Sequence, residues 1–119
     1  MNKLIKSLLV AGGIVLGAQA QAGDIMSIPP AQGLTTCSAV FSTLAVFAKN
    51  PDNKDYWSQL GFRTEQAAER YNPNAMNESF AIAKIYVAKV RADDREFAGK
   101  METIVPNCKT YVTKYGVGI

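Results

Sequence analysis

The side chains best suited to chemistry in this 119-residue chain are two cysteines and a few carboxylates, because the sequence contains no histidine. Without an imidazole the chain has no histidine-based triad, no His/Cys zinc site and no His-ligated haem. Cys37 and Cys108 are 71 positions apart, far from the Cys-x-x-Cys spacing of redox-active pairs. We therefore predict a structural disulfide, which would stabilise the fold by about 4.4 kcal/mol in the chain-entropy treatment.

Two groups of carboxylates are the remaining candidates for catalysis or metal binding. Glu65 and Glu69 share a helix face, but they lie among arginines, a pattern typical of surface ion pairs. The acidic group at 93–96 also alternates with arginines, whereas hard cations need several converging oxygens without adjacent positive charge. The chain also lacks a phosphate loop, a dinucleotide fingerprint and a nucleophile elbow. We predict no catalytic residue, metal site or cofactor, and we do not expect an enzyme.

A cluster of aromatic residues is the best candidate for a binding surface. Tyr56, Trp57 and Phe62 cannot all occupy one narrow buried stripe, because consecutive helical positions are about 100° apart. Together with Arg63 they match the composition of binding hot spots, so we predict a partner-binding surface at these four residues. The alternative is that the helix breaks at Gly61 and turns Phe62 into the core.

The first 22 residues have the pattern of a cleaved secretory signal peptide, with two early lysines, an apolar middle and small residues at Ala20 and Ala22. The apolar stretch is too short for a stable membrane anchor. Without these residues the chain has 11 basic and 10 acidic side chains, so its charge gives no reason to expect nucleic acid binding. We predict a soluble exported protein, periplasmic or secreted, that is cleaved near Ala20 or Ala22.

The rest of the chain predicts an extended or partly disordered lead-in at 23–34 and a single helical domain at 35–119. The fold class is all-α, a small up-down-up-down four-helix bundle, because short loops force antiparallel neighbours. This topology brings the two cysteines to the same end of the bundle. The fourth helix is expected to kink at Pro106, or a new helix begins there. The predicted helices are 36–49, 54–71, 75–98 and 100–115.

The third predicted helix has an unusually broad apolar face. Met76, Phe80, Ala83, Val87 and Val90 recur at helical spacing, and further apolar residues flank this stripe. We assign the stripe to the core of the bundle, with contacts to more than one neighbouring helix. Binding to a membrane surface through this helix is then a minor alternative, because the bundle itself uses the apolar face.

The function predicted from these features is protein–protein binding. A small exported helical module without catalytic residues suits an inhibitor, an immunity factor or an accessory subunit of another envelope protein. The alternatives are a carrier of a small apolar ligand or lipid in the bundle, and a structural or stress-protective envelope protein. A homodimer through an exposed stripe is also compatible with so short a bundle.

Overall fold

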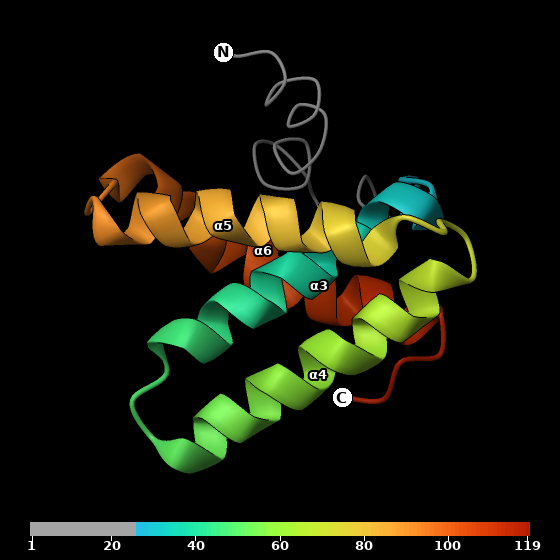
Figure 1. Cartoon of the computed structure of the whole chain (residues 1–119), viewed down its shortest axis with the longest axis horizontal. Coiled ribbons are helices and arrows are strands. Elements are labelled where there is room, and N and C mark those ends of the chain that lie inside the picture. The colour runs from blue at the N-terminus through green and yellow to red at the C-terminus, as the bar shows by residue number, and fades with distance from the viewer. Residues whose placement is uncertain (1–25) are drawn as a thin grey trace.

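The computed structural model describes residues 26–119, and these residues form four helices and no strand (Figure 1). The predicted all-α, four-helix fold is confirmed. Short turns at which the chain reverses join the helices. The predicted leader at 1–22 lies outside the described residues. The helices are α3 (Pro30–Phe47), α4 (Pro51–Glu69), α5 (Ala75–Arg91) and α6 (Arg95–Lys114).

The prediction of an extended lead-in at 23–34 is wrong from Pro30 onward, because α3 begins there. Proline suits the first turn of a helix, where its fixed φ is helical and its missing N–H has no intrahelical partner. The N–H of Gly33 already donates to the carbonyl of Pro29 at 2.8 Å. Gly33 also allows a close approach, since a Cβ at this position would overlap the ring of Tyr111. This segment therefore belongs to the core helix.

The second helix is continuous, so the predicted break at Gly61 does not occur. Gly61 is buried against α3, and a Cβ there would lie only 3.1 Å from the hydroxyl oxygen of Ser42. The hydroxyl of Ser38 on α3 also donates to the Gly61 carbonyl at 3.1 Å. The glycine therefore permits the close contact between α3 and α4, which offsets its cost of about 1 kcal/mol in a helix interior.

The boundary between the third and fourth helices is earlier than predicted. α5 ends at Arg91 because Asp93 adopts a left-handed backbone with φ of 58°. Asp94 then caps α6, and its carboxylate accepts a hydrogen bond from the N–H of Phe97 at 3.0 Å. Gly99, the predicted terminator, lies exposed within α6.

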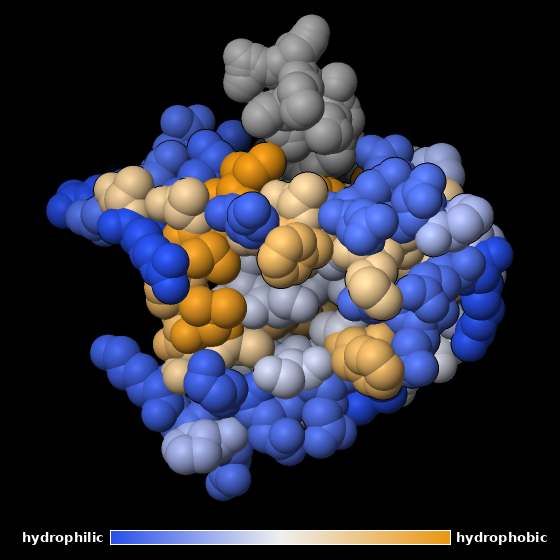
Figure 2. Space-filling view, viewed as in Figure 1, coloured by the Kyte–Doolittle hydropathy of each residue, from blue (hydrophilic) through white to orange (hydrophobic). Residues whose placement is uncertain are grey.

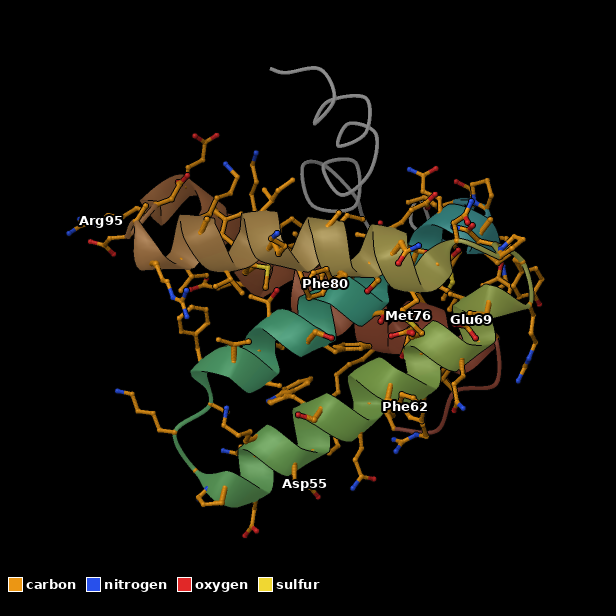
Figure 3. The ribbon with its side chains drawn as sticks, viewed as in Figure 1. Asp55, Phe62, Glu69, Met76, Phe80 and Arg95 are labelled. Atoms are coloured by element: carbon orange, nitrogen blue, oxygen red, sulfur yellow. A yellow bond between two sulfur atoms is a disulfide. The ribbon has the colours of Figure 1, made fainter. Side chains whose placement is uncertain are left out.

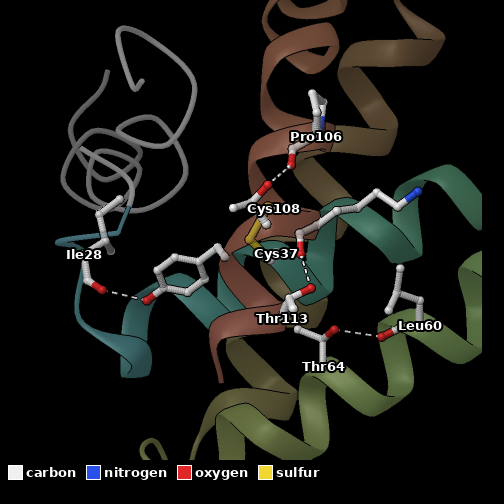
Figure 4. Close-up of a disulfide and its surroundings, with 10 residues drawn as sticks. Ile28, Cys37, Leu60, Thr64, Pro106, Cys108 and Thr113 are labelled. Carbon is white, nitrogen blue, oxygen red and sulfur yellow. Dashed lines mark hydrogen bonds between the residues drawn. A yellow bond between two sulfur atoms is a disulfide. The ribbon is translucent and has the colours of Figure 1, made fainter. Parts of the chain in front are cut away.

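α6 and α3 are joined by the predicted disulfide (Figure 4). Cys37 and Cys108 are both fully buried, with their Cα atoms 5.4 Å apart. α6 passes through Pro106 as one helix, so the alternative of a new helix starting there is wrong. Next to the disulfide, the hydroxyl of Tyr111 donates to the carbonyl of Ile28 at 2.6 Å.

α3 is the central helix of the fold. Every residue from 33 to 41 is buried, so α3 is surrounded by protein along this stretch, and it contacts α4, α5 and α6. The hydroxyls of Thr35 and Thr43 each donate a hydrogen bond of 2.8 Å to the backbone carbonyl four residues earlier. These bonds satisfy the two polar side chains inside the core. The contact between α4 and α5 is much smaller than the contact of either helix with α3. The two helices diverge from their shared turn, and α3 lies between them (Figure 1).

Candidate protein-binding face

α5 buries only one edge of the broad apolar face that was predicted to lie in the core. The predicted core stripe is largely exposed, with Phe80 67% and Met76 57% exposed. Small residues let α5 approach α3 closely, and the hydroxyl of Ser79 donates to that of Ser38 at 3.1 Å. The prediction that this stripe lies in the core is therefore wrong for Met76, Phe80 and Val90. The buried residues of α5 are Ala75, Ser79, Ile82 and Tyr86.

α4 adds an exposed aromatic ring to the same side of the molecule. Phe62 is 59% exposed, so the alternative in which it turns into the core is wrong. Phe62, Met76 and Phe80 all lie on the face that Figure 3 presents to the viewer. Asp55, Phe62 and Glu69 follow one another at seven-residue intervals, which places them along one side of α4.

The end of α3 forms the floor between these two helices. Val46 is 46% exposed and lines an open pocket of about 290 Å³. The amine of Lys54 lines the same pocket and donates to the carbonyl of Ala45 at 2.7 Å, near the end of α3. Figure 2 shows apolar side chains gathered between α5 and α4, where the surface is hollowed. We call this region the α4–α5 face, defined by Val46, Phe62, Met76, Phe80, Ala83, Val87 and Val90.

Basic side chains lie along the α5 edge of the face. The amine of Lys84 lies 5.6 Å from the centre of the Phe80 ring, and the guanidinium of Arg91 lies 5.9 Å from the centre of the Phe47 ring. Both are within the range of cation–π contacts. A bound partner would meet these two positive charges next to the exposed apolar surface.

Acidic side chains lie along the α4 edge. Asp55 and Glu69 flank Phe62 on the same side of the helix, and Glu65 lies between them. Burial raises the pKa of the Glu65 carboxyl above its usual value, and the nearby Glu69 carboxylate raises it further. The outer edges of the face therefore carry opposite charges, and the Lys54 amine, which donates to the Ala45 carbonyl, lies on the floor between them.

The other residues of the predicted binding surface lie on a different side of α4. Trp57 stacks on Phe41 with ring centres 5.8 Å apart, and Tyr56 meets Trp57 edge-on at 4.9 Å. The amine of Lys109 on α6 lies 5.5 Å from the centre of the Tyr56 ring and 5.4 Å from the centre of the Trp57 ring. Tyr56 and Trp57 are therefore in contact with Lys109 of α6, and Trp57 also contacts Phe41 of α3. Phe62, five positions beyond Trp57, points about 140° away around the helix.

Arg63 and Tyr56 hold the C-terminal segment. The guanidinium of Arg63 donates to the carbonyl of Gly118 at 2.8 Å, and the Tyr56 hydroxyl donates to that of Ile119 at 3.3 Å. The structure therefore brings Tyr56 together with Trp57 through their rings and with Arg63 at the C-terminal segment, whereas Phe62 points to another side of α4. The signal that could have identified the α5 part of the face was the width of its apolar surface, which exceeds what one central helix can cover.

Within residues 26–119, no group of three or more His, Cys, Asp or Glu side chains could hold a metal ion. No helix in the same range is long and apolar enough to cross a membrane. Over residues 26–119 the site and fold define an all-α protein with a buried disulfide and an open apolar face. No family model matches the chain, and searches of curated proteins and of solved structures return no match.

Proposed function

We propose that this chain is an exported, periplasmic or secreted protein that acts by binding another envelope protein through the α4–α5 face. The observation that carries the proposal is the exposure of Met76 and Phe80, two large members of the apolar stripe of α5 that the fold does not bury. Contiguous apolar surface with charged edges is typical of protein interaction sites. An inhibitor, an immunity factor and an accessory subunit are the kinds of protein that this proposal includes.

The shape of the face suits a macromolecule. It extends along two helices and is open, and such grooves accept the apolar side of a partner helix. The open pocket on the floor of the α4–α5 face is lined partly by the polar residues Ser42, Ser58 and Lys54. It therefore does not resemble an apolar interior site for lipid. Export is supported by the buried disulfide, which persists in oxidising compartments, and by the pattern of the first 22 residues. The carrier and stress-protective alternatives stay predictions.

The test is affinity capture from envelope extract, followed by purification of the captured protein and measurement of its dissociation constant. Phe80→Glu should weaken binding at least about 30-fold, the effect of losing an interface hot spot. Ile119→Glu is the matched control, because Ile119 is also an exposed apolar residue (53%) but is not part of the α4–α5 face, and its carbonyl accepts a hydrogen bond from Tyr56. It should leave the affinity unchanged.

A third variant separates this face from the surface predicted from the sequence. Trp57→Ala removes one ring of the Tyr56–Trp57 pair, which lies on a different side of α4 from Phe62. If binding were lost with Trp57→Ala and kept with Phe80→Glu, the partner would use the Tyr56–Trp57 side and the proposed face would be wrong. If no protein bound the chain with measurable affinity, the proposed function itself would fail.

A further inference from the structure

We propose that a second copy of this chain covers the α4–α5 face in the free protein, forming a twofold, face-to-face dimer. This inference rests on the proposed function, because it names an occupant for the same face. A partner from the envelope would then have to displace one copy.

The face has enough apolar surface for a modest interface. At about 200 Å² for a whole phenylalanine side chain, the exposed fractions of Phe62 and Phe80 amount to about 250 Å². Val46, Met76 and Val90 add to this area. A stable interface needs about 800 Å² from each partner, of which somewhat more than half is apolar. The apolar part of the face, with its charged edges, approaches this requirement.

The charges select one of two face-to-face twofold arrangements. An axis across the groove would place α5 on α5 and α4 on α4, so that like charges would face each other. An axis along the groove places the basic edge of α5 on the acidic edge of α4 in the other copy, twice by symmetry. The surface is therefore complementary to itself in this second arrangement.

The spacing of the charges agrees with the same arrangement. α4 and α5 diverge from the turn at 70–74 (Figure 1). The twofold along the groove would place the turns of the two copies opposite each other. Arg91 is 17 residues beyond this turn and Asp55 is 15 residues before it, about 25 and 22 Å along their helices. Arg91 of each copy would therefore lie opposite Asp55 of the other.

The acidic edge also argues against the main alternative occupant. A bilayer with anionic lipids would attract Lys84 and Arg91 but repel Asp55, Glu65 and Glu69. A groove between two diverging helices is also hollowed, as Figure 2 shows, whereas a membrane surface requires a flat or convex apolar face.

The first test is sedimentation equilibrium of the chain, isolated with its disulfide intact, between about 1 and 300 µM, a range that resolves micromolar dissociation constants. We expect a reversible monomer–dimer equilibrium. Phe80→Glu should raise the dimer dissociation constant at least about 30-fold, and the control Ile119→Glu should leave it unchanged. A wild-type chain that is monomeric throughout this range, or a dimer that tolerates Phe80→Glu, would overturn the inference.

The second test is an exchange of charges that reports on the orientation of the two copies. Arg91→Asp and Asp55→Arg should each weaken the dimer roughly threefold to tenfold, because each change affects two symmetric contacts. The double variant should recover most of the wild-type affinity. Additive weakening in the double variant would rule out this arrangement. Circular dichroism confirms that each variant is folded.

Failure of this inference can be distinguished from failure of the proposed function. A monomeric chain that binds a purified envelope protein in a Phe80-dependent way would overturn the dimer and leave the proposed function intact. A Phe80-dependent dimer without any other protein partner would support the dimer and overturn the proposed function. Phe80-dependent binding of the monomer to vesicles with anionic lipids would overturn both.

Discussion

Two substitutions on α5 decide which side of this helix forms the core, and with it whether the α4–α5 face exists. Phe80→Ala removes a ring that is 67% exposed, so only about a third of its full burial energy of 1.5–3 kcal/mol is lost. The higher helix propensity of alanine returns about 0.5 kcal/mol. We therefore expect the free energy of unfolding to change by less than about 0.7 kcal/mol.

The comparison variant is Ile82→Ala, two positions further along the helix. Ile82 is only 9% exposed and packs in the core cluster. Truncation of a buried isoleucine to alanine leaves a cavity and costs about 2–5 kcal/mol. The structure thus predicts that the two truncations differ by at least about 1.3 kcal/mol in their effect on the free energy of unfolding, although both residues are apolar and lie on the same helix.

The assay is urea unfolding monitored by circular dichroism, with equal m-values required before the free energies are compared. Each variant is measured at two protein concentrations, because a dimer would add a concentration-dependent contribution to the stability of the wild type that Phe80→Ala would lose. A large loss for Phe80→Ala at low concentration, with little change for Ile82→Ala, would refute the structural argument. α5 would then bury the stripe that periodicity predicts, and the face would not exist.

Three further predictions concern the rest of the fold. Gly33→Ala should destabilise the protein by about 2 kcal/mol in the same unfolding assay, because the new Cβ would displace the buried ring of Tyr111. Gly99→Ala should stabilise it by about 0.5–1 kcal/mol, because a Cβ at this position has no neighbouring atom within 4 Å and alanine has the higher helix propensity. Reduction of the disulfide should lower the free energy of unfolding by up to about 4.4 kcal/mol, and a change below about 1 kcal/mol would show that the cross-link contributes little. Burial raises the pKa of Tyr86 and Tyr111 above the usual tyrosine value of about 10, so their contribution to stability is complete below pH 10 and is lost at higher pH. Absorbance titration of tyrosinate should show delayed ionisation in the folded chain, and Tyr86→Phe should reduce the loss of stability in alkali.

The sequence was sufficient to predict what depends on local chemistry. Helical periodicity, turn residues and the two cysteines predict four helices and the disulfide between the first and the last of them, and the structure confirms both. The boundaries were less predictable. Asp93 ends α5 by adopting a left-handed backbone, and no pattern distinguished it from the charged residues around it.

Gly61 shows why local propensity was insufficient. Its cost to an isolated helix is real, but the interface with α3 requires the absence of a side chain, and this requirement is known only when the neighbour is known. The same holds for Gly33 and Tyr111, which are far apart in the sequence and in contact in the fold. Such positions are set by tertiary packing, which overrides propensity.

The candidate site was only partly predictable for a related reason. Periodicity measures how apolar each side of a helix is, but packing also depends on how closely two helices can approach. α5 approaches α3 through Ala75 and Ser79, whose small side chains allow the contact. The Ser79 hydroxyl donates to that of Ser38, which in turn donates to the Gly61 carbonyl on α4. The larger residues Met76 and Phe80 are left outside. An apolar stripe that the fold does not bury needs a different explanation from a core stripe, and association with another polypeptide is the explanation that fits its charged edges.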